Sequence, residues 1–90
     1  MRRYYFHTQT TSRSTDNEGM EFATPAQARC QAIATCGEMM RDAPEGFWLS
    51  RPWSVVVTDD VGLVLWEIYV DGTASVAAPS LVREPSGGNG

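Results

Sequence analysis

The sequence contains no lysine, one histidine and two cysteines in 90 residues. Its seven cationic side chains are all arginines and stand against eleven acids, which leaves a formal net charge of −4. Affinity for nucleic acid comes mainly from clustered cations, so this balance argues against a phosphate-binding surface. Three arginines lie in residues 1–13, and the other four share the remaining chain with all eleven acids. The pattern indicates a weakly basic start on an acidic body.

Long apolar runs are also missing. The longest, residues 61–70, is interrupted by Gly62 and Glu67 and is about half the length of a membrane span. The pair Arg2-Arg3 is not followed by the apolar segment that an export signal requires. We therefore expect a cytoplasmic protein.

The two cysteines, Cys30 and Cys36, fall on one predicted helix. Six residues of helix rise about 9 Å, more than the roughly 7 Å between Cα atoms that a disulfide can bridge. Neither cysteine belongs to a CxxC motif, which disfavours a zinc or redox site. We expect two reduced thiols, with no metal and no cofactor.

Length and composition predict a single domain over residues 1–72, followed by a disordered tail over residues 73–90. The tail is dominated by Ala, Ser, Pro and Gly, and its apolar surface is too small to offset the entropy lost on ordering. A domain of this size buries only about 60% of its unfolded surface. Its stability is therefore marginal, and we expect a homo-oligomer, a dimer in the first instance.

Alternating segments rich in aromatic and β-branched residues predict four strands in two hairpins. A polar loop over residues 10–18 joins the first pair, and Asp59-Asp60-Val61-Gly62 joins the second, as is typical of tight β turns. The expected strands are Arg3–Gln9, Gly19–Phe22, Trp53–Thr58 and Leu63–Val70.

One helix is predicted between the hairpins. Thr24-Pro25-Ala26-Gln27 matches a capping box with proline at the first helical position, so the helix should run from Pro25 to Arg41 or Asp42. A helical wheel predicts a buried stripe, with a mid-helix glycine that allows close approach to the sheet. The stripe comprises Ala26, Cys30, Ile33, Gly37 and Met40.

Between this helix and the second hairpin, residues 43–52 carry Phe47, Trp48 and Leu49. We expect a loop here that folds back over one edge of the core.

Together these elements predict an α+β fold, a four-stranded antiparallel sheet of β-β-α-β-β order with one helix packed on one face. The other face would then be uncovered. If Phe6, Val55, Val57, Val64, Trp66, Ile68 and Val70 meet the helix, strict alternation assigns the opposite face to another set. That set is the candidate interface: Tyr5, His7, Val56, Leu65 and Tyr69.

Three segments resemble an uncharacterised family of small, mostly alphaproteobacterial proteins of unknown function. They are the opening Arg3-Tyr4-Tyr5-Phe6-His7, the turn Asp16-Asn17-Glu18-Gly19, and the hairpin that begins Val55-Val56-Val57 and ends at Gly62. The resemblance covers about residues 2–70 and implies no activity. The order of strands and helix is also similar to that of HicB-type antitoxins, a likeness of fold alone.

No constellation predicts catalysis. His7 is the single histidine, and neither a serine nor a cysteine is placed by the sequence as its nucleophile. A strand histidine bonded to a neighbouring strand or to solvent is the plainer interpretation. We therefore expect a non-enzymatic interaction module that self-associates through the uncovered face. Two alternatives stay open: an antitoxin-like regulator that masks a basic protein, and a small-ligand pocket between loop and sheet, lined by Trp48, Trp53, Trp66 and the tyrosines.

Overall fold

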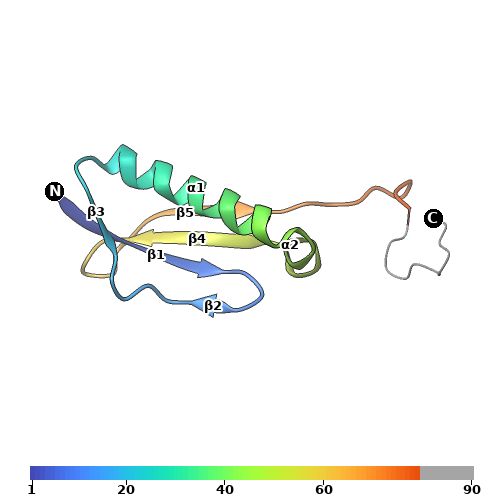
Figure 1. Cartoon of the computed structure of the whole chain (residues 1–90), viewed down its shortest axis with the longest axis horizontal. Coiled ribbons are helices and arrows are strands. Elements are labelled where there is room, and N and C mark those ends of the chain that lie inside the picture. Colours follow the sequence, from blue (N-terminus) through green and yellow to red (C-terminus); the bar gives the residue numbers. More distant parts are fainter. Residues whose placement is uncertain (80–90) are drawn as a thin grey trace.

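A computed structural model of the chain describes residues 1–79. It is an α+β fold in which α1 lies along one face of an antiparallel sheet (Figure 1). The α+β class is confirmed, but the described part holds five strands and two helices where four and one were expected. In chain order these are β1 (Arg2–Gln9), β2 (Arg13–Ser14), β3 (Met20–Phe22), α1 (Pro25–Asp42), α2 (Pro44–Ser50), β4 (Trp53–Thr58) and β5 (Val64–Val70).

The strand order is β2-β1-β4-β5, and β3 also pairs with β1. The predicted first hairpin is therefore present, with β3 as its returning strand, but the segment 10–18 that was expected to be a loop also contains the short strand β2. Of the predicted tail, residues 73–79 carry no helix or strand, and residues 80–90 lie outside the described part.

Helix α1 begins and ends where the sequence predicts. The backbone N–H of Gln27 donates to Thr24 Oγ1, and Gln27 Oε1 accepts from Thr24 N–H, each at 3.2 Å. This reciprocal pair satisfies N–H groups that have no partner within the helix. At the other end the N–H of Ala43 donates to the carbonyl of Met39, and Pro44 prevents continuation.

The buried face of α1 is not the predicted one. Ala28, Ala32 and Cys36 are buried, whereas Cys30 is exposed and Ile33 is 57% exposed. Small apolar residues occur on both sides of this helix, so the helical wheel alone could not choose between them. Short side chains every fourth residue let the backbone lie close to the sheet, and that closeness selects the side with Ala28 and Ala32.

The role predicted for Gly37 is also wrong. A Cβ atom added there would meet nothing within 4 Å. The glycine therefore does not mediate the approach of helix to sheet.

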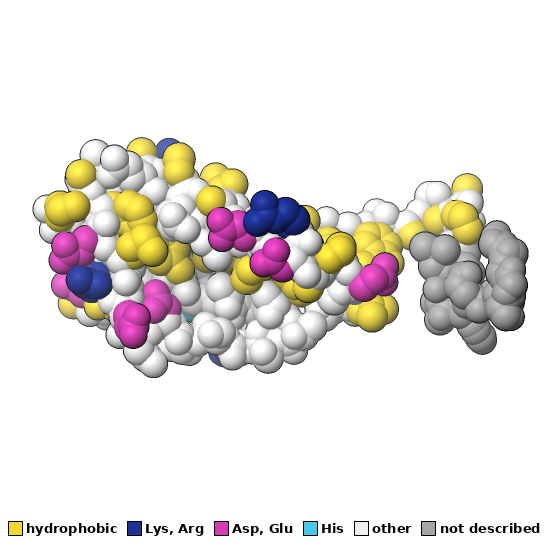
Figure 2. All heavy atoms as spheres, in the orientation of Figure 1, with side chains coloured by type: hydrophobic (Ala, Val, Ile, Leu, Met, Phe, Trp, Pro, Cys, Tyr) yellow, Lys and Arg dark blue, Asp and Glu magenta, His cyan; other side chains and the backbone are white. Residues whose placement is uncertain are grey.

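Figure 2 shows hydrophobic side chains along the outer side of α1 and almost none over β2.

Beneath α1 lies one apolar core. Tyr4, Val55 and Val57 are its buried sheet members, and the ring of Tyr4 stacks on that of Trp66 with centroids 6.3 Å apart. The predicted helix-facing set is correct except at Val64, which is 49% exposed. A register shift between Val57 and Thr58 explains the exception. It inserts one extra residue in β5, so that Leu65 packs against the core and Val64 lies opposite Thr58.

The segment after α1 is a short helix rather than a loop. Helix α2 begins at Pro44, and the ring of Phe47 meets that of Trp53 edge-on with centroids 5.5 Å apart. This contact agrees with the predicted fold-back over a core edge. Leu49, in contrast, is 80% exposed.

Candidate functional site

The sheet face opposite α1, here called the open face, is built from rows of side chains that cross β1, β4 and β5. Cross-strand neighbours share a face of an antiparallel sheet, so the strand register defines the rows directly. The rows are Gln9-Ser54-Tyr69, His7-Val56-Glu67 and Tyr5-Thr58-Val64.

Four of the five predicted interface residues lie on this face. Tyr5, His7 and Val56 are half-buried, and Tyr69 is 64% exposed. Leu65 differs, because the register shift turns it toward the core. Periodicity could not reveal this, since the extra residue appears only when β5 is paired with β4.

His7 is held by hydrogen bonds at both ring nitrogens. The backbone N–H of Asp16 donates to Nδ1 at 3.1 Å, and Nε2 lies 3.0 Å from Thr58 Oγ1. Because Nδ1 accepts, the proton of a neutral ring is on Nε2, which donates to Thr58. A histidine that activates a hydroxyl needs an unprotonated ring nitrogen directed at that hydroxyl, whereas here the unprotonated Nδ1 accepts from a backbone N–H. This geometry agrees with the plainer interpretation of His7 as a structural histidine.

The carboxylate of Asp16 organises the connection between β2 and β3. Its Oδ2 accepts from the N–H of Phe6 at 3.1 Å, and its Oδ1 accepts from the N–H groups of Glu18 and Gly19 at 3.0 and 3.1 Å. Burial raises the pKa of Asp16, but the bonds from Gly19, Phe6 and Glu18 together outweigh it, so the pKa lies below its ordinary value. The carboxylate thus replaces the strand partner that β1 lacks where its neighbour is split.

Gly19 completes this turn. Its φ is +72°, a conformation that glycine adopts readily. A Cβ atom there would lie 2.9 Å from the carbonyl oxygen of Tyr4. Asp16 and Gly19, which belong to one of the segments that carry the family likeness, therefore have a structural role.

A depression of about 390 Å³ lies on the open face. Arg13, His7 and Tyr69 contribute to its walls, with Val56 also lining it. The guanidinium Nε of Arg13 donates to Gln9 Oε1 at 3.1 Å. The volume is near the lower end of the range for small-ligand sites. Of the residues expected to line a ligand pocket, Tyr69 borders this depression and none of the three tryptophans does.

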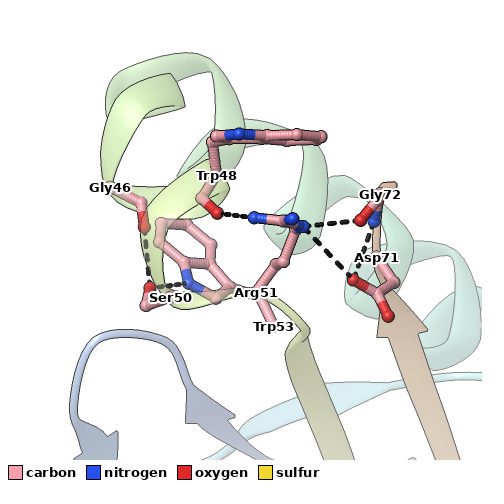
Figure 3. A network of polar contacts seen from close by, with 7 residues as sticks. All are labelled: Gly46, Trp48, Ser50, Arg51, Trp53, Asp71 and Gly72. Carbon is pink, nitrogen blue, oxygen red and sulfur yellow. Dashed lines mark hydrogen bonds and ion pairs between the residues drawn. The ribbon is translucent and has the colours of Figure 1, made fainter. Parts of the chain in front are cut away.

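A second polar network fastens α2 to the end of β5 (Figure 3). The guanidinium of Arg51 lies flat against the ring of Trp48, 3.7 Å from its centroid. Its Nε donates to the carbonyl of Gly72 at 2.5 Å, and Nη1 donates to the carbonyl of Trp48. Asp71 adds an ion pair at 3.8 Å. We call this group the Arg51 strap.

Beneath the strap, Trp53 anchors the start of β4. Its indole N–H donates to Ser50 Oγ at 2.7 Å, and Ser50 Oγ donates to the carbonyl of Gly46, also at 2.7 Å. Aromatic residues were expected here, but Arg51 was not, because both of its hydrogen-bond acceptors are backbone carbonyls, which no side-chain pattern reveals.

Within residues 1–79, no three His, Cys, Asp or Glu side chains are grouped so that they could hold a metal ion. No helix in that range has the length and apolar character needed to cross a membrane.

The model of one protein family matches residues 3–71, from β1 to the residue that follows β5. That family is a domain of unknown function, DUF6894. The chain belongs to it. Neither the curated proteins nor the solved structures include a match to this chain. The matched range contains the open face and most of the Arg51 strap, and membership brings no activity with it.

Proposed function

We propose that this chain is a non-enzymatic, cytoplasmic interaction module that binds a second copy of itself through the open face. The observation that supports the proposal is the contrast between the two faces of one sheet. Helix α1 covers one face, while the other carries Tyr69 and Val64 at 64% and 49% exposure, with Val56 between them in the middle strand. Burying such groups contributes about 25 cal/mol per Å² of apolar surface.

The arrangement of residues on the open face suits contact with a second copy. Val56 lies at the centre, and Tyr5 and Tyr69 lie on rows to either side of it, as aromatic anchors do around the centre of protein interfaces. The face also carries Arg13 and Glu67, which are opposite in charge. A two-fold axis through Val56 would bring Arg13 of each copy toward Glu67 of the other.

The test is the native mass of the full chain by size-exclusion chromatography with light scattering. Val56→Lys places a charge at the centre of the open face and should lower the oligomer mass. Val61→Lys is the matched control, because Val61 is 83% exposed at the β4–β5 turn and lies off the rows. A wild-type chain that is monomeric at high micromolar concentration, or a Val56→Lys variant of unchanged mass, would contradict the proposal.

The alternative of an antitoxin-like regulator that masks a basic partner is motivated by the acidic body of the chain. The open face gives it little support, since Arg13 offsets Glu67 there. Capture of a basic protein from native lysate should weaken as salt rises. Recovery of none at low salt would remove this alternative.

The alternative of small-ligand binding is motivated by the depression beside Arg13 and Tyr69. Self-association through the open face would cover that depression. A ligand that binds there should therefore shift the oligomer toward monomer, which light scattering detects.

A further inference from the structure

Strand β5 is an edge of the sheet. It pairs with β4 on one side, and no strand of the described residues pairs with it on the other. An open edge presents backbone groups that can pair with another strand, and proteins usually protect it with lysine, proline or bulges. Between Trp66 and Val70, β5 contains none of these protections. Its one charge, Glu67, accepts a hydrogen bond from the hydroxyl of Tyr69 at 2.6 Å.

The direction of the backbone groups in β5 follows from a bond at the far side of β1. The N–H of Phe6 donates to Asp16, which lies away from β4. N–H groups alternate in direction along a strand, so Val57, the partner of Phe6, directs its own toward β5. Applied to the β4–β5 register, the same alternation directs the backbone groups of Ile68 toward β4. Those of Glu67 and Tyr69 therefore point to the open edge, and no other described backbone group bonds to them.

The regular part of this edge is short and symmetrical. On one side it stops at the register shift beside Leu65. On the other it stops at Asp71 and Gly72, which Arg51 holds. The usable segment is therefore Trp66–Val70, and Ile68 is at its centre.

We propose that β5 pairs with β5 of a second copy, antiparallel, about a two-fold axis at Ile68. In this register Glu67 lies opposite the partner's Tyr69, and the outward N–H and C=O groups of both residues form the bonds of the pair. The hydroxyl of the partner's Tyr69 then comes near the Glu67 carboxylate that Tyr69 of the same chain already contacts. A two-fold axis at Glu67 would instead set two carboxylates face to face, which destabilises a strand pair.

The side chains of the core side fit the same register. Trp66 lies opposite the partner's Val70, and both residues are half-buried in one chain. Pairing therefore extends the sheet and joins the two apolar layers beneath the two α1 helices. A second copy of this chain supplies both pairings, Glu67 with Tyr69 and Trp66 with Val70, because the segment Trp66–Val70 pairs with itself about Ile68.

The edge pairing goes beyond the proposed function, because it uses the backbone groups at the edge of β5 rather than the side-chain surface of the open face, although Glu67 and Tyr69 belong to both. Each contact is isologous, so either alone yields a dimer, and the two together yield a closed tetramer when their two-fold axes cross at right angles. Blocking one should leave the dimer that the other forms.

The first experiment compares Glu67→Pro with Glu67→Ala in the full chain by light scattering. Proline removes an N–H that points away from β4, so the internal ladder is retained while edge pairing is blocked. Alanine removes the carboxylate but keeps the N–H. We expect Glu67→Pro to halve the oligomer mass relative to Glu67→Ala, and Val56→Lys to halve it separately. Equal masses for Glu67→Pro and Glu67→Ala would overturn the edge contact while leaving the open-face proposal standing.

The second experiment uses the wild-type chain, so it does not depend on how a variant folds. Amide exchange at Glu67 and Tyr69 is followed by nuclear magnetic resonance at low and high protein concentration. We expect both amides to become at least tenfold slower to exchange as the oligomer forms, because pairing buries their N–H groups. Exchange that stays fast at concentrations where the oligomer is populated would overturn the edge pairing.

Discussion

The backbone N–H of Asp16 donates to Nδ1 of His7 over 3.1 Å, and this bond ties the β2–β3 connection to the open face. The same residue uses its carboxylate to hold the N–H groups of Phe6, Glu18 and Gly19. One residue therefore positions both parts: its carboxylate holds the turn, and its backbone N–H holds a histidine that lies in the candidate interface.

Replacing Asp16 with alanine should destabilise the chain by about 1–2 kcal/mol, because hydrogen bonds to a charged acceptor are lost at a partly exposed site. Urea unfolding followed by tryptophan fluorescence, at one fixed protein concentration, measures the change. Asn17→Ala is the control and should shift stability by less than about 0.5 kcal/mol. Equal stability of the two variants would show that the carboxylate does not organise the turn.

Acid should weaken the fold through the same carboxylate. The pKa of Asp16 in the folded chain lies below its ordinary value of 3.8. A depressed pKa means that the contribution is fully present above the unfolded-state pKa and is lost as pH falls through the folded-state pKa. The melting temperature of the wild type should therefore drop below about pH 4 more steeply than that of Asp16→Asn. If the melting temperatures of the wild type and of Asp16→Asn fell in parallel as the pH was lowered, the acid sensitivity would not come from the Asp16 carboxylate.

The Arg51 strap predicts coupled effects on stability. A Cβ atom at Gly72 would lie 2.7 Å from Trp48 Cζ3, so Gly72→Ala should displace the indole from Arg51. Arg51→Lys keeps the charge but loses the flat stacking surface and the two-pronged donation to carbonyls. Each variant should cost about 1 kcal/mol. The double variant should cost less than the sum, as a double-mutant cycle by urea unfolding would show; strict additivity would mean that the two residues act separately.

Gly37→Ala should stabilise the chain by about 0.5–1 kcal/mol, because alanine favours helix and the site has room for it. Gly19→Ala is the contrasting variant, since its φ of +72° and the nearby carbonyl of Tyr4 oppose any side chain. Thermal unfolding should move in opposite directions for the two. A loss of stability in Gly37→Ala would indicate that another chain approaches the helix there.

The two thiols should react at different rates. Cys30 is exposed, whereas Cys36 is buried and burial raises the pKa of its thiol, which lowers its thiolate fraction. A disulfide reagent should label one thiol rapidly in the native chain and the second only on unfolding. The rapid phase should vanish in Cys30→Ser and persist in Cys36→Ala.

Local signals predicted the elements that depend on local chemistry. The capping box at Thr24 and Gln27 marked the start of α1, and Pro44 marked its end. The hairpin after Thr58 formed as expected, with Asp59 Oδ1 accepting from the N–H groups of Val61 and Leu63 at 3.0 and 2.9 Å. Alternation assigned most of the open face correctly, because a strand period of two leaves no choice once one face is buried.

Contacts between segments distant in the sequence decided the features that local signals did not predict. The side of α1 that faces the sheet, the exchange of Val64 and Leu65, and the partners of Arg51 each depend on how closely two distant segments approach. No pattern within one segment encodes that distance, particularly on a helix whose small residues occupy both sides. The sequence by itself determined α1 and the strands β1, β3, β4 and β5. The tertiary structure added β2 and α2 and decided which side chains the elements bury, because packing and register are properties of pairs of elements.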